Sequence, residues 1–151
     1  MNILISNEQS ALSVDEDTLE TALTAILKFL EVTTDEVSLC LVDRETVCAL
    51  HEEHFDDPSF TDCMTFPIDG KNPSEGYHVL GEMVICPEAA QIHAAETGND
   101  PYDELLLYLA HCACHLIGYD DLTDSERAEM RHQEARILQY LKQESIDLHP
   151  K

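Results

Sequence analysis

The sequence has few positive charges. Its 151 residues include only 8 Lys and Arg against 31 Asp and Glu, which gives a formal net charge of −23 at pH 7. Non-specific binding to nucleic acid depends on Lys and Arg side chains that release the counterions of phosphate groups. This composition argues against a protein that coats bulk RNA or DNA, and it predicts repulsion from anionic membranes. It still allows an enzyme whose metal ion supplies local positive charge, or one that meets RNA on a larger particle.

The sequence also lacks a long apolar segment and an export signal. The longest strongly apolar run, residues 105–117, is interrupted by Tyr108, His111 and His115. It is shorter than the roughly 20 residues that cross a bilayer. Residues 1–30 contain neither the basic start nor the apolar stretch of a signal peptide. We therefore expect a cytoplasmic protein that does not enter a membrane.

The six cysteines do not form metal-binding or disulfide patterns. None of them has the Cys-x-x-Cys spacing of a zinc knuckle. Because we expect the protein in the reducing cytoplasm, free thiols are favoured over disulfides. Cys112 and Cys114 lie two positions apart on an expected helix and face nearly opposite ways, so both cannot bind one ion. We interpret them as packing residues.

Length and hydrophobic pattern predict a single domain over residues 1–151, with a polar tail from about residue 144. No repeat, low-complexity segment or linker divides the chain. Apolar runs predict strands at residues 3–5, 37–42, 63–68 and 79–86. Five helices are expected: from the capping box Ser13–Glu16 to Leu30, over residues 44–54, 88–96 and 102–117, and from the capping box Thr123–Glu126 to about residue 142.

The helix over residues 102–117 is expected to be the central one. Asp100 suits the N-cap, Pro101 suits the first helical position, and Gly118 is a natural C-terminal stop. Apolar residues surround most of its circumference, as they do in a helix buried inside a domain.

Two histidines interrupt the apolar surface of this helix. Glu104, Tyr108, His111 and His115 follow one another at spacings of four, three and four, so they form one stripe and the two imidazoles can converge on an ion. Such spacing alone is common. Burial strengthens the interpretation, because an unpaired buried polar group costs about 1–3 kcal/mol and a metal would satisfy both rings. Core histidines with other polar partners are the alternative.

A carboxylate follows the histidine pair. Beyond His115 the helix stops at Gly118, and Asp120 and Asp121 come next, so one of them can fold back as a third ligand. Two His and one carboxylate leave an open position for water, which is the arrangement of catalytic zinc. Each Asp could instead stabilise the turn or cap the next helix. Cys112 occupies the place where the zinc-peptidase motif has its general base, so the base is unknown.

Three ordered motifs resemble those of one bacterial family. Residues 111–121, HCACHLIGYDD, resemble the H-G-x-x-H-L-x-G-Y-D-H signature of the YbeY family of rRNA maturation endoribonucleases. Residues 61–67, TDCMTFP, are similar to its T-D-V-L-S-F-P, and residues 80–85, LGEMVI, are similar to its L-G-D-I-V-I. Together these motifs run from about residue 50 to residue 121.

The resemblance implies an α+β domain with a mixed four-stranded sheet packed with about five helices. It implies one zinc ion per chain, held by His111, His115 and Asp121, with Asp120 orienting a ligand. The implied activity is single-strand-specific RNA cleavage in 16S rRNA 3′ end maturation and ribosome quality control. The implied partners are rRNA, the small ribosomal subunit and its assembly proteins, with no DNA and no membrane.

Three positions depart from the family pattern. Asp121 replaces the third His, Cys112 replaces a Gly, and Phe55 stands where an Arg is expected. An anionic Asp lowers the net charge of the site and should make the bound water less acidic. Loss of the Arg removes a bidentate phosphate partner. A ribosome-assembly factor with a structural metal and little nuclease activity is therefore the alternative function.

The best candidates for phosphate contacts are the few remaining cations near the signature. Arg127 and Arg131 lie one turn apart on the expected last helix, and Lys71 lies in a loop. The alternative is that these are solvated charges that pair with acidic neighbours.

Overall fold

Four strands form one mixed sheet in the order β1-β2-β4-β3. The computed structural model describes residues 1–150. Strands β1 (Asn2–Glu8), β2 (Glu36–Val42) and β4 (Val79–Ile85) run parallel, and the edge strand β3 (Cys63–Pro67) runs antiparallel to β4. The four strands expected from the sequence are all present, and the mixed sheet is confirmed.

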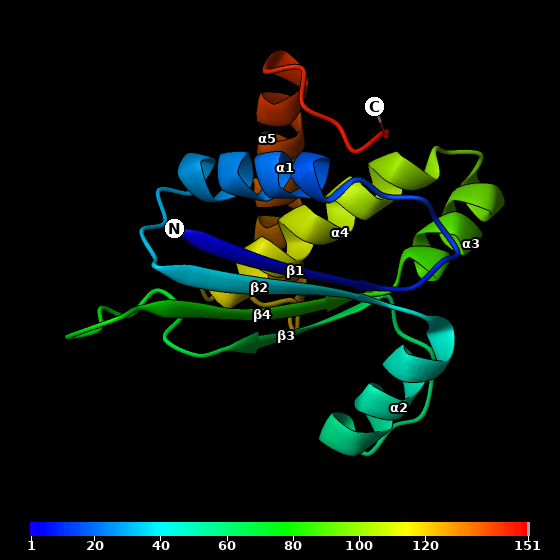
Figure 1. The fold of residues 1–151 in the computed structure, drawn as a ribbon, viewed down its shortest axis with the longest axis horizontal. Coiled ribbons are helices and arrows are strands. Elements are labelled where there is room, and N and C mark those ends of the chain that lie inside the picture. The colour runs from blue at the N-terminus through cyan, green and yellow to red at the C-terminus, as the bar shows by residue number, and fades with distance from the viewer. Residues whose placement is uncertain (151) are drawn as a thin grey trace.

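Five helices accompany the sheet. Figure 1 shows α1, α4 and α5 on one side of the sheet, whereas α2 lies toward the other side beyond the end of β2. Helix α4 contacts β3, β4, α1, α3 and α5, so it is the central helix of the domain. The bounds are α1 (Glu16–Phe29), α2 (Arg44–Phe55), α3 (Pro87–Thr97), α4 (Pro101–Leu116) and α5 (Asp124–Gln143).

The core lies between the sheet and this helical layer. Fully buried side chains come from α1, from the inner face of β2 and β4, and from nearly the whole circumference of α4. The expectation of an α+β domain with a buried central helix is therefore confirmed. Representative core residues are Leu23, Leu39, Met83, Leu105, Leu109 and Leu116. Within residues 1–150, no helix combines the length and apolar character needed to cross a membrane.

The predicted start of α1 is wrong by two residues. Asp15, not Ser13, is the N-cap, because its carboxylate accepts hydrogen bonds from the backbone N–H groups of Asp17 at 2.9 Å and Thr18 at 3.4 Å. The second capping box is confirmed: Thr123 and Glu126 each accept a hydrogen bond from the backbone of the other.

The C-terminal segment packs back onto the domain. Leu148 is buried in the core, and the imidazole of His149 contacts the carboxylate of Asp100 at 2.9 Å. Because Asp100 caps α4, the polar segment expected from about residue 144 is tied to the start of the central helix.

Candidate metal site

Helix α4 sets the positions of both predicted histidine ligands. The Asp100 carboxylate accepts a hydrogen bond from the Tyr102 backbone N–H at 2.7 Å, and Pro101 occupies the first helical position, as the sequence predicted. His111 and His115 lie one turn apart near the C-terminal end, with ring centroids 4.5 Å apart and ring planes at 84°. Two nearly perpendicular rings can direct one nitrogen each toward a common point.

Three side chains converge beyond the last turn of α4. The Nε2 atoms of His111 and His115 are 3.1 Å apart, and the Asp121 Oδ2 lies 3.7 Å from the first and 3.5 Å from the second. Tetrahedral bonds of about 2.0–2.1 Å to one ion separate neighbouring ligand atoms by about 3.3 Å. The three observed distances bracket that value, so the donor set and its spacing fit a single metal ion.

The turn after α4 brings Asp121 back to the histidines. Gly118 has a φ of 104°, in the region that favours glycine, and the Tyr119 backbone N–H donates to the Cys114 carbonyl at 3.0 Å. The carboxylate of Asp120 accepts the backbone N–H of Asp121 at 2.9 Å. Asp120 therefore stabilises the turn that presents Asp121, and Asp121 alone joins the histidine cluster.

Arg127 holds the same turn from α5. Its guanidinium donates to the backbone carbonyls of Asp121 and Leu122 at 3.2 Å and forms an ion pair with Asp124. Arg127 was predicted to contact phosphate, but its guanidinium has a structural role in this turn that competes with phosphate binding. In the structure, its donors are engaged in positioning the segment that carries the third ligand.

The other two predicted cations line two different cavities. Arg131 borders a cavity of about 170 Å³ that is also lined by His111 and Asp121. Lys71 lies in the β3–β4 loop and borders a larger cavity of about 590 Å³, which the triad residues do not line. Arg127 also lines the smaller cavity, so two of the three predicted cations border the space that His111 and Asp121 line, and of these Arg131 is the one whose guanidinium does not hold the turn.

A buried carboxylate that the sequence did not predict contacts the site. The Nδ1 of His111 donates to the Glu134 Oε2 at 2.5 Å, and Glu134 is only 8% exposed. This bond leaves Nε2 of His111 as the free nitrogen that faces Asp121, and it increases the basicity of the ring. Burial opposes protonation of the ring, but the Glu134 hydrogen bond and nearby negative charges outweigh it and raise the pKa of His111.

A sequence signal for Glu134 exists in α5. The helix begins at its capping box, and its buried positions recur at helical spacing, so an acidic residue on the apolar face is visible as an exception. The buried positions of α5 are Met130, Gln133, Glu134, Ile137 and Leu141.

The expectation that the histidine pair is buried is wrong. The side chains of His111 and His115 are 27% and 22% exposed, so they are half-buried rather than enclosed in the core. Their stripe on α4 faces a cavity next to α5, where water can reach polar atoms. Convergence with Asp121, rather than the cost of unpaired burial, is the feature that marks the site.

Of the three residues that depart from the family pattern, Asp121 joins the two histidines, whereas Cys112 and Phe55 do not belong to the cluster. Cys112 and Cys114 are fully buried, which agrees with the packing interpretation, and burial raises the pKa of Cys114 to about 12. Phe55 is 55% exposed at the end of α2, where its ring contacts those of His51 and Phe66.

The fold and the His-His-Asp cluster define the class: a small α+β domain with a candidate metal site at the end of its central helix. The sequence profile of the family described as Endoribonuclease YbeY matches residues 4–142. The chain belongs to the YbeY family of endoribonucleases.

Individual relatives agree with this assignment. Proteins named Endoribonuclease YbeY from Protochlamydia amoebophila and Chlamydia muridarum are 39% and 37% identical. The alignments cover 91% and 98% of this chain and 91% and 92% of those proteins. The fold is also similar to the solution structure of TM1509 from Thermotoga maritima, with a TM-score of 0.65 and 24% identity over 95% of this chain and 91% of that one.

Proposed function

We propose that this chain is a zinc-dependent, single-strand-specific endoribonuclease that acts in 16S rRNA 3′ end maturation and ribosome quality control in the cytoplasm. The observation that carries the proposal is the convergence of His111, His115 and Asp121 within the distances that one ion requires. Membership of the endoribonuclease YbeY family supports RNA as the substrate. Three protein ligands leave a coordination position for the reaction.

The residues of the chain supply the geometry of the reaction. His111 and His115 would each present one ring nitrogen to the ion, and Glu134 fixes the ring of His111. When bound, the ion supplies Lewis acidity for a phosphoryl oxygen and lowers the pKa of water. Arg131 borders the cavity that His111 and Asp121 line, so it is positioned to attract the phosphate backbone.

Electrostatics favour a substrate presented by a larger particle. With a net charge of −23 and Arg127 engaged with Asp124, the free protein attracts phosphate weakly. Docking beside small-subunit assembly proteins would raise the effective concentration of the rRNA. The same charge supports the alternative function, a ribosome-assembly factor with a structural metal and little or no nuclease activity.

Cleavage assays separate the two functions. Purified protein is incubated with single-stranded RNA, and with small-subunit particles that contain the same RNA, with and without a chelator. The nuclease proposal predicts chelator-sensitive cleavage that is faster on particles than on naked RNA. Inactivity on both substrates would instead support the assembly factor, and robust chelator-insensitive cleavage would contradict the proposed mechanism and indicate a contaminating nuclease.

Restoring the missing cation sharpens this test. We expect Phe55→Arg to increase the cleavage rate of naked RNA several-fold, because an Arg can pair bidentately with phosphate. Phe55→Lys is the matched control, since it restores charge without the guanidinium geometry. An unchanged rate with Arg would show that position 55 does not contact the substrate.

A further inference from the structure

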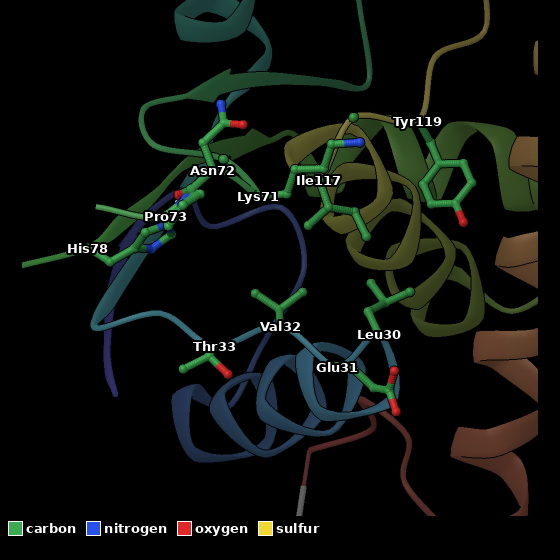
Figure 2. Close-up of a pocket in the computed structure, with 12 residues that line it drawn as sticks. Leu30, Glu31, Val32, Thr33, Lys71, Asn72, Pro73, His78, Ile117 and Tyr119 are labelled. Atoms are coloured by element: carbon green, nitrogen blue, oxygen red, sulfur yellow. The ribbon is translucent and has the colours of Figure 1, made fainter. Parts of the chain in front are cut away.

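The larger cavity lies behind the turn that joins two of the candidate metal ligands. It has a volume of about 590 Å³, which falls in the range of small-molecule sites. Three segments enclose it: residues 30–33 after α1, residues 70–73 with His78 in the β3–β4 loop, and residues 117–119 after α4 (Figure 2). Residues 117–119 stand between His115 and Asp121 in the chain, so the cavity and the triad share one turn.

The wall formed by the β3–β4 loop is held in place by hydrogen bonds. The two ring nitrogens of His78 contact the Thr34 Oγ1 at 2.7 Å and the Asn72 carbonyl oxygen at 2.9 Å. Both nitrogens are therefore satisfied, and the ring ties this loop to the start of β2. A cavity with such a wall requires little reorganisation to receive a ligand.

Lys71 places a free positive charge at this cavity. Within residues 1–150, its ammonium group forms neither an ion pair nor a hydrogen bond, although the chain has a large excess of acidic residues. A Cβ added at Gly118 would lie 3.4 Å from the Lys71 Nζ, so the ammonium group sits directly over the turn after α4. An unpaired ammonium in this position is available to an anionic ligand.

The centre of the cavity is apolar and has an aromatic side. Figure 2 shows Val32 and Ile117 approaching the same space from opposite sides, with Leu30 beside them. Tyr119 also lines the cavity, and its hydroxyl accepts a hydrogen bond from Gln133 at 2.7 Å, which fixes the ring. An apolar space beside a fixed aromatic ring suits a flat, partly apolar group such as a nucleobase.

Two charged side chains at the cavity favour one orientation of a bound ligand. Lys71 and Glu31 lie on opposite sides of it in Figure 2. A phosphate is attracted by the ammonium and repelled by the carboxylate, whereas ribose hydroxyls can donate to the carboxylate. An acidic peptide would gain only the Lys71 contact and would leave the apolar centre unused, so the features together favour a nucleotide.

We propose that this cavity binds one nucleotide of single-stranded RNA, with its phosphate at Lys71, its base between Val32, Ile117 and Tyr119, and its sugar toward Glu31. The inference rests on the proposed nuclease function and deepens it. Because the cavity and the triad share the turn at residues 117–119, the nucleotide bound here is one that lies near the scissile phosphate. The cavity would therefore select unpaired RNA, since a base held in a duplex cannot enter it.

Nucleotide binding can be measured without catalysis. The full-length protein is titrated with uridine 5′-monophosphate in the presence of a chelator, so that no ion at the triad can bind the phosphate. Calorimetry gives the affinity, and NMR shifts locate the site. We expect shifts at residues 70–73 and 117–119. We also expect about tenfold weaker binding by Lys71→Met, because a charged hydrogen bond is lost.

Matched variants separate this cavity from general charge effects. Lys142→Met removes a lysine near the C-terminal end of α5 and should leave the affinity unchanged. Thr33→Trp places a large ring in the cavity from an exposed position and should abolish binding. Inorganic phosphate alone and uridine alone should each bind more weakly than the monophosphate.

Three results would overturn the proposal. If inorganic phosphate binds as tightly as the nucleotide, the cavity is an anion site to which the base and the sugar add no affinity. Unchanged nucleotide affinity in both Lys71→Met and Thr33→Trp would place binding elsewhere. Binding of an acidic hexapeptide that depends on Lys71, without binding of the nucleotide, would identify a protein partner instead.

Cleavage kinetics distinguish failure of this proposal from failure of the nuclease function. On single-stranded RNA, both cavity variants should increase KM several-fold while the metal content stays the same. If the unmodified protein cuts no RNA in any form but binds the nucleotide as described, the nuclease function fails and the nucleotide site stands. If the protein cuts RNA and both variants keep its KM, the nucleotide site fails alone.

Discussion

Two buried glutamates lie beside histidines around α4, and only one of them orients a histidine of the candidate metal site. Glu134 on α5 accepts a hydrogen bond from His111 at 2.5 Å, whereas Glu104 on α4 lies 3.8 Å from the imidazole of His93 on α3. Each glutamate is 8% exposed. Their burial is the same, but only the first pair makes a hydrogen bond.

The difference lies in the second nitrogen of each ring. The Nε2 of His111 faces His115 and Asp121, so the bond from Nδ1 to Glu134 orients a candidate metal ligand. The Glu104 Oε2 is buried without a hydrogen-bond partner among residues 1–150, and the side chain of His93 is 53% exposed. Burial of a carboxylate beside a histidine therefore does not define a site. A site is defined where the ring nitrogen that does not bond the carboxylate converges with further candidate ligands.

The largest expected effect comes from removing the rings themselves. The unmodified protein should contain close to one equivalent of zinc after purification without added metal, and His111→Ala with His115→Ala should contain none. His93→Ala is the matched control and should retain the full equivalent, because His93 has no converging partner ligand. Elemental analysis measures all three proteins. Equal metal content in the double variant would refute the site.

Asp121 should have the next largest effect. Asp121→Ala removes one of three ligands and should weaken metal binding strongly, while Asp121→His should keep or strengthen it because imidazole suits zinc. Asp120→Ala should weaken binding less, since its carboxylate holds the backbone of the turn. Competition with a chromogenic chelator gives the affinities. Tight binding in Asp121→Ala together with weak binding in Asp120→Ala would show that the two roles are exchanged.

The two glutamates can be compared directly. Glu134→Gln should lower metal affinity about 10–100-fold, because the residue that orients His111 loses its charge. Glu104→Gln, at equal burial, should leave metal affinity unchanged. The same chelator competition measures both variants. Similar losses in the two would mean that charge in the core, and not orientation of one ring, controls the site.

A third histidine–carboxylate pair on α4 extends the comparison to the surface. The hydrogen bond that the His149 ring donates to the Asp100 carboxylate raises the pKa of His149, and the same bond lowers the pKa of Asp100. The pair therefore stabilises the fold below the raised His149 pKa and above the lowered Asp100 pKa, and its contribution disappears as the pH rises through the first or falls through the second.

This exposed pair should give the smallest effect. Water screens it, so His149→Ala should cost about 0.2–1 kcal/mol near pH 5 and almost nothing above about pH 8. Thermal unfolding of both proteins at several pH values measures the difference, and high salt should reduce it. A difference that persists at high pH would show that His149 acts through packing against Tyr102, whose ring centroid lies 4.9 Å away.

Local patterns in the sequence predict most of the fold but only part of the site. The Asp100-Pro101 start, the apolar circumference and the Gly118 stop of α4 each depend on neighbouring residues, and the structure confirms them. The candidate ligand Asp121 is within reach of the same helix end. These features follow from spacing along the chain.

The remaining features depend on packing between distant segments. Glu134 meets His111 only because α5 crosses α4, and their separation of 23 residues leaves no local signal of the pairing. Lys71 reaches the Gly118 turn because the β3–β4 loop folds against the end of α4. Competition between adjacent polar residues explains the misplaced start of α1, where Asp15 caps the helix instead of Ser13.

A zinc titration tests the central claim most directly. Metal-free protein is titrated with zinc while the cleavage of single-stranded RNA is followed. If His111, His115 and Asp121 hold the ion that cuts the RNA, activity should rise in proportion to added zinc and level off at one equivalent per chain. Full activity of the metal-free protein, or a plateau unrelated to one equivalent, would contradict the claim.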